Sequence, residues 1–479
     1  MTWLGLAEIA YMVGGDLQGE DRQISSVSTD SRTVQNDQLF IAINGENFDA
    51  HDFVASIENK AAAALVHKKI DCDLPQIIVK DTLKSLGIFA AACRQQFSKP
   101  VIGLTGSNGK TTVKEMLAAI LACKGEVMAT FGNLNNDIGL PLTLLRLREH
   151  YAYAVIEMGA NHFGEIDYLS HITQPDVAIL NNAGAAHLEG FGDVKGVSRA
   201  KAEIFNGLSD DGIAVINADD QYADYWLSCN ENRKIITFGF SDQADVKGKL
   251  SGDGLLVQVA EDEKQIIKLA LLGRHNAMNA LAASAAAIAV GADLMIIKQG
   301  LESLQAVKGR LALIRGINGI NAVNDGSIID DTYNANPDSA RAAIDVLAEK
   351  RDNQRILVLG DMVELGDNAV QLHREIGTYA KSQGIDALYC LGKYSKAASE
   401  SFADKGFHFD VIESLIEALR QIIRQQEQLG DKQAMTVLVK GSRSMQMERV
   451  VEALSCKSNQ EKTVGGVNNN SGLAEIVLC

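Results

Sequence analysis

VIGLTGSNGKTTVKEMLAAIL, residues Val101 to Leu121, is the stretch that decides the fold. It starts with an apolar run typical of a buried strand, formed by Val101, Ile102 and Leu104. Apolar residues then recur at the spacing of one helix face, at Val113, Met116, Leu117, Ile120 and Leu121. The pattern predicts a buried strand, a loop and an amphipathic helix.

The loop between these two predicted elements contains Gly106, Ser107, Asn108, Gly109, Lys110, Thr111 and Thr112. Its glycines let backbone N–H groups approach phosphate oxygens, and the helix N-terminus adds a positive partial charge. Lys110 can reach the β- and γ-phosphates, and the Thr111 hydroxyl can ligate Mg²⁺. Leu104 stands where the usual phosphate loop has its first glycine, so this loop is shorter than in motor proteins or GTPases. An ordinary turn is the alternative, but Gly-Lys-Thr-Thr between a strand and a helix favours a nucleotide phosphate site.

The composition is that of a soluble globular protein with two to four domains. The 479 residues are 46% hydrophobic and 22% charged, and the formal net charge is −16. This acidic balance argues against binding of nucleic acid or of an anionic membrane surface. The seven cysteines have no framework spacing, no apolar stretch is long enough to span a bilayer, and the first residues lack the basic region of a signal peptide. We therefore expect a cytoplasmic protein without membrane insertion.

The order of predicted elements divides the chain into a small α/β domain, a central domain, a third domain and a flexible tail, at residues 1–82, 83–311, 312–456 and 457–479. Strands and helices alternate in the central domain, which predicts a parallel sheet with crossover helices. The third domain repeats strand–helix pairs, which predicts a doubly wound sheet whose loops GDMVELG and KGSRSM form one rim of a site. Within it, Asn324–Ser327 is predicted to be a hairpin turn, and Asn336 and Pro337 to start a helix.

Several polar residues of the central domain stand at predicted strand ends or helix starts. Glu157 ends the strand AVIE, where an acid could face a Mg²⁺ on the phosphate loop, although a strand-end carboxylate is usually just solvated. His187 lies on a loop of small residues and Lys201 near the start of a helix; a structural histidine and a solvated lysine are the alternatives. Asn276 and Asn279 could read an adenine edge, or Asn276 could simply cap its helix.

Two further polar segments are candidates for substrate binding. Asn135 and Asn136 belong to a polar cluster that predicts a binding loop. A hydroxyl-rich segment near the N-terminus contains Ser28, Thr29, Asp30, Ser31 and Arg32. By itself this segment favours a turn with caps, but its donors and Arg32 would also suit a diphosphate or a uracil edge.

In their order and spacing, these blocks resemble the bacterial cell-wall amide ligases, the Mur ligase family, over nearly the whole chain except the tail. STDSR and GENFDAH resemble the UDP-sugar-binding first domain, and GSNGKTT resembles the ATP loop. EMGANHFGEI, NNAGAAHLEGFG, AKAEIF and GRHNAMNALAA resemble blocks of the central domain. DDTYNANPDS, GDMVELG and KGSRSM resemble the third domain, and DDTYNANPDS separates the dipeptide-adding member from its sister enzymes.

The resemblance implies an α/β fold of three domains: a small α/β UDP-binding domain, a central parallel-sheet P-loop ATPase domain and a C-terminal doubly wound Rossmann-like domain. It implies an ADP-forming ligase of peptidoglycan precursor synthesis, which joins D-alanyl-D-alanine to UDP-N-acetylmuramoyl-tripeptide through an acyl phosphate. The implied cofactors are ATP and two Mg²⁺ ions. We expect a monomer whose site lies between three domains, so that the domains must close over the nucleotide.

The resemblance also implies roles for individual residues. Thr111 and Glu157 would hold one metal ion. His187 and Lys201 would hold the second, with Lys201 as a carbamate, and Arg310 would swing onto the γ-phosphate beside Lys110. The nucleotide would be bound by Gly106, Ser107, Asn108, Gly109, Lys110, Thr111, Thr112, Asn276, Asn279, Arg310, Asp331, Tyr333 and Asn334. The UDP portion would be bound by Ser28, Thr29, Ser31 and Arg32, with Asn135 and Asn136 nearer the peptide.

Two other readings stay open at this point. A related ligase with another acceptor would be a sister wall enzyme or a folate polyglutamate ligase; the folate enzyme typically has a small residue after Gly-Lys and lacks the STDSR domain. A nucleotide-binding regulator would use the loop as a switch and catalyse no ligation. The co-occurrence of Thr111, Glu157, His187 and Lys201 favours an enzyme, because a switch needs no second metal site.

Overall fold

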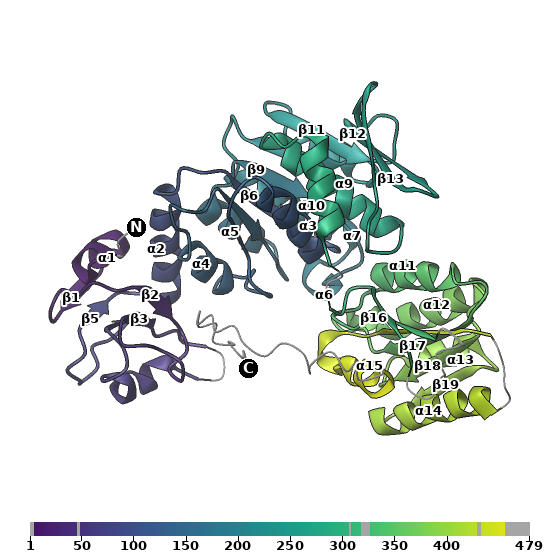
Figure 1. Ribbon diagram of the computed structural model, residues 1–479. Helices are drawn as coiled ribbons and strands as arrows, with labels where there is room; N and C mark the ends of the chain where they lie inside the picture. Colours follow the sequence, from purple (N-terminus) through teal and green to yellow (C-terminus); the bar gives the residue numbers. More distant parts are fainter. Residues whose placement is uncertain (1–3, 46–47, 306–307, 318–325, 429–432, 456–479) are drawn as a thin grey trace, which may run out of the picture.

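The computed structural model describes residues 4–45, 48–305, 308–317, 326–428 and 433–455. They form three α/β units arranged as an arch, with the central unit at its top (Figure 1). Each unit has its own sheet, of five, nine and six strands in chain order. The predicted tail at 457–479 lies outside the described residues.

The first unit has the strand order β1-β5-β4-β3-β2, in which only β1 and β5 pair antiparallel. Its elements are α1 (Leu6–Val13), β1 (Asp16–Gln18), β2 (Ser26–Ser28), β3 (Gln38–Ile41), the 3-10 helices η1 (Ala50–Phe53) and η2 (Ala55–Ile57), β4 (Ala63–Val66) and β5 (Gln76–Ile78). Helix α2 (Thr82–Gln95) packs on α1 and also on α4 and α5 of the central unit. One apolar core is therefore continuous across the first domain boundary.

The central unit is built around the predicted strand, loop and helix, which are β6 and α3. Its sheet has the order β14-β13-β12-β11-β10-β9-β6-β8-β7. Neighbours from β7 to β12 are parallel, as predicted, but β13 and β14 run antiparallel at one edge. The strands β12 to β14 correspond to no predicted strand; β12 and β14 are rich in polar and charged residues and are largely exposed.

The bounds of the strands in the central unit are β6 (Val101–Thr105), β7 (Val127–Ala129), β8 (Tyr153–Glu157), β9 (Val177–Leu180), β10 (Ile213–Asn217), β11 (Lys234–Gly239), β12 (Val246–Ser251), β13 (Gly254–Ala260) and β14 (Glu263–Ile267). Its helices are α3 (Lys110–Ala122), α4 (Gly139–Leu144), α5 (Glu165–Thr173), α6 (Leu188–Phe191), α7 (Val194–Ala202), η3 (Glu203–Gly207), α8 (Ala223–Ser228), α9 (Arg274–Ala289) and α10 (Leu294–Ser303).

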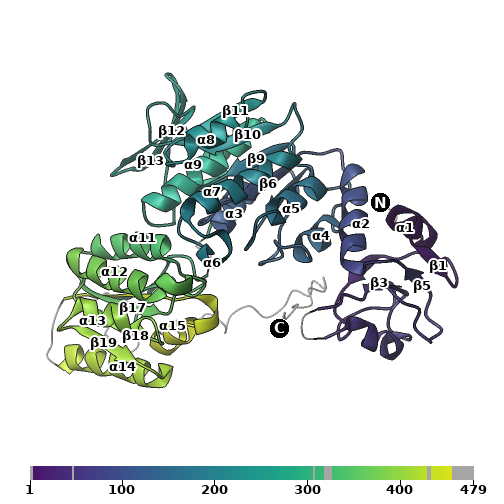
Figure 2. The same cartoon turned by 180° about the vertical axis from the view of Figure 1, so that it is seen from behind.

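Helices cover both faces of the central sheet (Figures 1 and 2). Alternate residues of β6 face opposite sides: Val101 joins the core formed with α2, α4, α5 and α7, whereas Ile102 and Leu104 join the core formed with α3, α9 and α10. All the apolar residues predicted to line the strand and the helix face are buried. The loop between β6 and α3 is therefore anchored on both sides by packed elements.

The third unit has the strand order β15-β16-β20-β17-β18-β19, and only β15 is antiparallel to its neighbour. Asn336 caps α11 through a capping box and Pro337 is its first residue, as predicted. Strands β15 and β16 pair antiparallel, but the predicted hairpin turn at Asn324–Ser327 falls partly on residues 318–325, which lie outside the described residues. The elements are β15 (Ala312–Arg315), β16 (Ser327–Asp331), α11 (Pro337–Ala348), β17 (Gln354–Gly360), η4 (Gly366–Asn368), α12 (Ala369–Ser382), β18 (Ala387–Leu391), α13 (Lys396–Phe402), β19 (Gly406–Phe409), α14 (Ile412–Gln428), β20 (Met435–Lys440), η5 (Arg443–Met445) and α15 (Glu448–Leu454).

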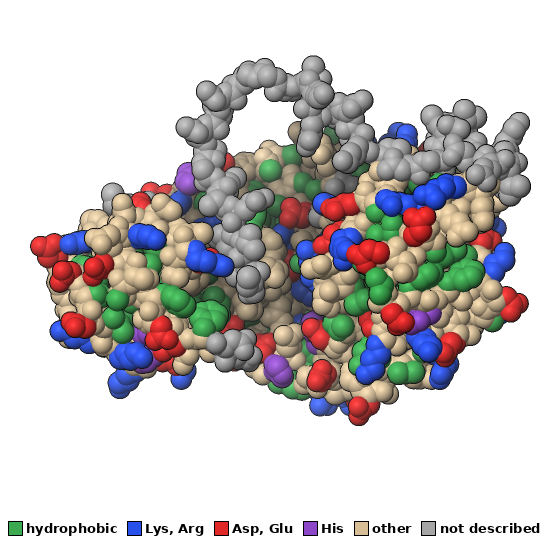
Figure 3. Space-filling model, turned by 90° about the horizontal axis from the view of Figure 1, so that it is seen from below, with side chains coloured by type: hydrophobic (Ala, Val, Ile, Leu, Met, Phe, Trp, Pro, Cys, Tyr) green, Lys and Arg blue, Asp and Glu red, His purple; other side chains and the backbone are tan. Residues whose placement is uncertain are grey.

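The surface carries charges of both signs. Figure 3 looks into the hollow between the first and third units, and basic and acidic side chains are interspersed over the outer faces on this side. Within the described ranges, no helix combines the length and the apolar character that a membrane crossing requires.

Candidate active site

A cavity of about 820 Å³ lies between the central and third units. Its wall contains the loop after β6, the loops after β8 and β9, the start of α9, and the loops after β16 and β20. Carboxyl ends of parallel strands are where open α/β sheets bind their ligands. The wall contains no residue of the first unit among those that the structure describes, so this cavity does not fulfil the expectation of a site shared by three domains.

The loop after β6 has the geometry of an anion-binding site. Gly109 has a φ of 78°, and a Cβ there would lie 2.3 Å from Asn279 Oδ1, so no side chain fits. Lys110 begins α3, where the first N–H groups of a helix have no intrahelical partner. Its Nζ donates to the carbonyl of Gly106 at 2.7 Å, and burial lowers the pKa of the amine. The predicted strand, loop and helix are therefore confirmed, and phosphate binding by the loop stays a prediction.

Glu157 is buried at the end of β8 and its carboxylate is held from two sides. The Thr111 hydroxyl donates to Oε2 at 3.0 Å, and Asn135 Nδ2 donates to Oε1 at 2.8 Å. The Glu157 N–H donates to Thr130 Oγ1 at 2.9 Å. With 2% exposure the solvated-carboxylate alternative is wrong. The carboxylate and hydroxyl oxygens are hard donors of the kind that Mg²⁺ prefers.

The polar loop that contains the predicted peptide-side residues has a supporting role in the structure. Asn135 and Asn136 both line the cavity. Asn135 orients Glu157, as described above, and Asn136 Oδ1 accepts the Gly139 N–H at 2.8 Å, beside the start of α4. Both side chains thus have protein partners.

His187 lies in the cavity wall and contacts the third unit. Its φ is 52°, and its Nδ1 lies 2.6 Å from Glu364 Oε2 without the alignment of a hydrogen bond. The contact with His187 lowers the pKa of the Glu364 carboxyl. The backbone of Glu364 is also left-handed, with a φ of 63°. Such backbone conformations cost a non-glycine residue of order 1–3 kcal/mol, so this contact joins two strained positions.

Lys201 is 1% exposed, so the alternative of a solvated lysine is wrong. Its Nζ lies 3.4 Å from the Ala160 carbonyl and 5.5 Å from the ring centre of Phe191. Burial lowers the pKa of this amine to about 7, and the charge of Lys110 acts in the same direction. Lys201 does not line the cavity, and no hydrogen bond or ion pair joins it to His187 in the described part of the chain.

Asn276 and Asn279 are buried in the cavity wall and bonded to each other. Asn279 Nδ2 donates to Asn276 Oδ1 at 3.2 Å, and Asn181 Nδ2 donates to Asn279 Oδ1 at 3.0 Å. Helix α9 begins at Arg274 with Gly273 at its cap position, so the prediction that Asn276 could cap the helix is wrong. The two amides support the phosphate loop from behind through Asn181, whose Nδ2 also donates to a carbonyl of that loop.

The third unit supplies the opposite wall. The predicted residues Asp331, Tyr333 and Asn334 line the cavity, and Arg310 stacks over the Tyr333 ring at 4.0 Å. Burial raises the pKa of the Asp331 carboxyl, while Lys440 Nζ lies 2.6 Å from its Oδ2. Lys440 is a site residue that the sequence analysis missed, although it opens the block KGSRSM that was predicted to form a rim.

Two hydrogen bonds fasten the third unit to the central loops. Asn336 Nδ2 donates to Asn108 Oδ1 of the phosphate loop at 2.7 Å. Asp338 Oδ2 accepts the Ala185 N–H at 2.7 Å, on the loop that also carries His187. The start of α11 therefore closes one end of the cavity.

The predicted uridine-side residues lie away from this cavity. Ser28, Thr29, Ser31 and Arg32 are absent from its wall. Arg32 forms a two-point ion pair with Asp30, at 2.9 and 2.8 Å, and this partner lowers the pKa of the Asp30 carboxyl. Ser28 Oγ accepts the Asp30 N–H at 3.2 Å. The segment is thus the hydroxyl-rich turn that its sequence favours.

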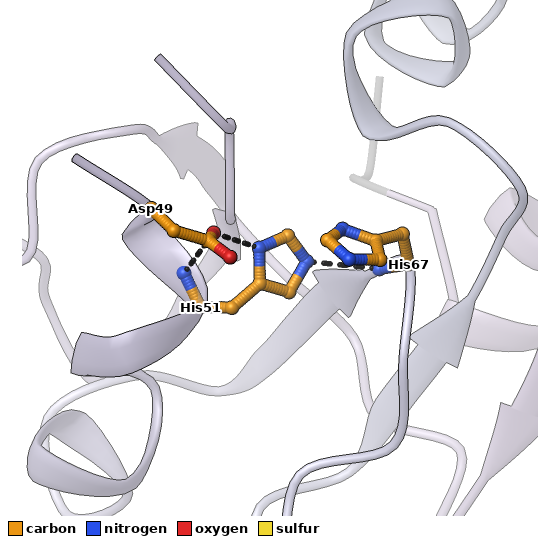
Figure 4. A group of neighbouring side chains, drawn as sticks. All are labelled: Asp49, His51 and His67. Atoms are coloured by element: carbon orange, nitrogen blue, oxygen red, sulfur yellow. Dashed lines mark hydrogen bonds and ion pairs between the residues drawn. The ribbon is translucent and has the colours of Figure 1, made fainter. Parts of the chain in front are cut away.

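Three side chains of the first unit, Asp49, His51 and His67, lie close together (Figure 4). His51 is buried; its Nδ1 lies 2.5 Å from Asp49 Oδ1, and its Nε2 accepts the His67 N–H at 2.9 Å. Burial lowers the pKa of His51, which keeps the ring neutral with both nitrogens engaged. The cluster ties η1 to the end of β4 and leaves His51 no lone pair for a metal ion.

Comparison with known proteins places these units in one family. Residues 23–124 match the model of the Mur ligase family catalytic domain, 104–287 the Mur ligase middle domain, and 309–443 the Mur ligase glutamate ligase domain. The UDP-N-acetylmuramoyl-tripeptide–D-alanyl-D-alanine ligase of Escherichia coli (strain K12) is 45% identical over 95% of this chain and 99% of its own length. The chain belongs to the Mur ligase family.

Solved structures of related ligases agree with the fold of this Mur ligase. A crystal structure of MurF from Acinetobacter baumannii superposes with a TM-score of 0.87 at 37% identity, over 94% of this chain and 99% of that one. The MurF ligase of Thermotoga maritima in complex with ADP gives 0.76 at 30% identity, over 89% and 96%. Every residue in the cavity wall of this Mur ligase falls within the matched middle and glutamate ligase domains.

Proposed function

We propose that this Mur ligase joins D-alanyl-D-alanine to UDP-N-acetylmuramoyl-tripeptide with cleavage of ATP to ADP and phosphate, in peptidoglycan precursor synthesis. The observation that carries the proposal is the pairing of a glycine-bearing loop with the buried Thr111–Glu157 contact, in a cavity closed by the third domain. Support for the acceptor comes from the 45% identity to the Escherichia coli ligase of that name and from the block DDTYNANPDS.

The donors at the loop fit a divalent cation. Thr111 and Glu157 would hold one Mg²⁺, which would neutralise phosphate charge. His187 would contribute to a second site, with Lys201 as a carbamate. A neutral amine is the form of lysine that reacts with CO₂, and burial of Lys201 lowers its pKa to about 7. Lys201 would need to reach the cavity, whose wall it does not join here.

The protein's own groups would act mainly by position and charge. The terminal carboxylate of the tripeptide attacks the γ-phosphorus and ADP leaves, which gives an acyl phosphate. The neutral amine of the dipeptide then attacks that carbonyl carbon, phosphate leaves, and the amine loses a proton. Lys110 and Arg310 would face the phosphates, and Asp331, Tyr333 and Asn334 would cover the nucleotide from the third domain. Such preorganised charge supplies most of the acceleration in phosphoryl transfer.

The first domain would hold the UDP portion with Ser28, Thr29, Ser31 and Arg32. Arg32 is already paired with Asp30, so binding would rely on the hydroxyl groups or on an exchange of this ion pair. Because the residues of the first domain do not line the cavity, the sugar–peptide would bridge the distance from that domain to the loop after β6. Asn135 and Asn136, which line the cavity, would lie nearer the peptide.

The test is phosphate release from ATP with UDP-N-acetylmuramoyl-tripeptide and a series of acceptors. Release with D-alanyl-D-alanine, and only background release with D-alanine, L-glutamate or L-lysine, is expected. Release with a single amino acid and none with the dipeptide would contradict the proposal in favour of a sister ligase. Nucleotide binding without any release would instead favour the regulator.

We also infer a cytoplasmic monomer. The cysteines that the structure describes are all free thiols, as expected in a reducing compartment: Cys72, Cys93, Cys123, Cys229 and Cys390. Light scattering during size-exclusion chromatography should give the mass of one chain, and a mass of two chains would refute the monomer.

A further inference from the structure

The cavity wall holds a cation that the proposed phosphate chemistry does not use. Arg443 lines the cavity from the loop after β20, and 64% of its side chain is exposed. Its hydrogen bond within the described chain joins Nη1 to Glu448 Oε1 at 2.9 Å. A guanidinium has five N–H donors in a planar fork, so a second edge of Arg443 remains to bind an anion.

The other lysines and arginines of the wall are engaged. Lys110 donates to a carbonyl of its own loop at 2.7 Å, and Lys440 lies 2.6 Å from a buried carboxylate. Arg310 and Arg274 each lie over an aromatic ring, 4.0 and 3.8 Å from its centre. Arg274 and Arg443 are both exposed, but among the basic side chains that the structure places in this wall Arg443 combines exposure with a guanidinium edge that a carboxylate, Glu448, holds in place.

The backbone that carries Arg443 is held firmly. The neighbouring Ser442 is 1% exposed, and its N–H donates to the Asp361 carbonyl at 3.0 Å. Its hydroxyl accepts the Val363 N–H at 3.0 Å. Glu448 begins α15 and fixes one edge of the guanidinium from behind. An arginine held in this way loses little side-chain entropy on binding, which makes it an effective carboxylate receptor.

We propose that Arg443 binds the terminal carboxylate of the dipeptide acceptor, an inference that rests on the proposed function. The acceptor has an amine at one end, which must reach the reacting carbonyl as a neutral group, and a carboxylate at the other. The cavity must also hold phosphates and a second substrate with carboxylates, so the acceptor's negative end needs a cation of its own. A guanidinium edge matches a carboxylate with two parallel hydrogen bonds.

This contact would make Arg443 a residue that selects acceptor length. When the amine is fixed at the reacting carbonyl, the carboxylate of a single amino acid lies about 3.5 Å nearer to that carbonyl than the carboxylate of a dipeptide. Because the base of Arg443 is fixed, the side chain would reach only the longer acceptor with good geometry. A single amino acid would leave its carboxylate unpaired, which is costly in a site partly shielded from water.

The test compares D-alanyl-D-alanine with D-alanyl-D-alaninamide, which replaces the carboxylate by a neutral amide. With wild-type protein we expect the KM for the amide to exceed that for the acid by about 10- to 100-fold, the range for a hydrogen bond to a charged group. Arg443→Ala should show the same rise with the acid and no further rise with the amide. Its KM for ATP and for the UDP substrate should stay at the wild-type value, which also shows that the variant is folded.

Arg449→Ala is the matched control. Arg449 lies on α15, pairs with Glu413 and does not line the cavity, so its removal should change no KM. An unchanged KM for the dipeptide in Arg443→Ala, or an equal rise for acid and amide, would overturn the inference. A rise confined to the UDP substrate would also overturn it, because Arg443 would then serve that substrate. Absence of any dipeptide-dependent phosphate release by wild type would instead refute the proposed function itself.

Discussion

Removal of one hydroxyl behind Glu157 should weaken the proposed Mg²⁺ site without removing a proposed ligand. Thr130 and Glu157 are each 2% exposed, and Thr130 Oγ1 accepts the Glu157 N–H at 2.9 Å. Thr130→Val keeps the shape but leaves that N–H buried without a partner, at a cost of about 1–3 kcal/mol. If the end of β8 shifts to relieve this cost, the carboxylate moves away from Thr111. Since 1.4 kcal/mol is a factor of ten, the Mg²⁺ concentration for half-maximal activity should rise about 5- to 150-fold.

The assay is phosphate release during a Mg²⁺ titration, combined with thermal unfolding. Thr130→Ser is the matched control, because it keeps the acceptor oxygen and loses only a methyl group, worth about 0.8 kcal/mol of burial. Lys114, whose Nζ donates to the Thr130 carbonyl at 2.7 Å, keeps its partner in both variants. If Thr130→Val and Thr130→Ser need the same Mg²⁺ concentration for half-maximal activity and unfold at the same temperature, the reasoning is refuted.

Three further predictions concern the side chains of Lys110, Lys201 and His373. Lys110→Ala should reduce turnover by about 10²–10³ with an unchanged circular dichroism spectrum, because it removes charge and no core contact; near-normal turnover would contradict the loop assignment. Lys201→Ala should be nearly inactive and partly rescued by acetate or formate, whereas high-resolution density for a free amine with Mg²⁺ and nucleotide bound would exclude the carbamate. Burial lowers the pKa of His373, whose Nε2 accepts the Met362 N–H at 2.9 Å, so its unfolded form binds a proton that its folded form does not. The contribution of His373 to the free energy of unfolding should be full above about pH 6.5 and should fall as the pH drops toward the lowered folded-state pKa. Thermal unfolding at pH 7.5 and 5.5 measures this loss, which should be smaller in His373→Gln.

The elements that the sequence predicted well are those with strong periodicity. The strand and helix at Val101–Leu121 combine an apolar run, a glycine loop and a helical apolar face, and each feature depends only on neighbours in the chain. The edge strands β12 to β14 were missed: β12 and β14 carry few apolar residues, and tertiary pairing decides the structure of all three. The start of α9 was also misplaced in the prediction for Asn276. Asn276 lies inside the first turn of this helix because the preceding loop ends at Gly273.

Residue types at strand ends indicated the site, but their partners could not be read from the sequence. The interpretation of Glu157 as an acid facing a Mg²⁺ on the phosphate loop stays a prediction, and the pairing of β8 with β6 explains why its carboxylate lies beside Thr111. Arg32 was matched by a local partner, Asp30, that the motif already contained. By contrast, Glu364 reaches His187, and Lys440 reaches the cavity, only through the packing of the third domain, so no local pattern distinguished them from solvated charges.

The contacts between the central and third domains are placed where ligand binding can control them. Asn336 bonds to Asn108 of the phosphate loop, and Asp338 bonds to Ala185 on the loop that carries His187. A neutral hydrogen bond contributes about 0.5–1.5 kcal/mol and one to a charged group about 1.5–3 kcal/mol, so these two bonds contribute only a few kcal/mol to the association of the two domains. A nucleotide that orders the same two loops would add to this stability, and its release would remove that addition. We therefore propose that these two bonds break and re-form within each catalytic cycle, so that ADP can leave.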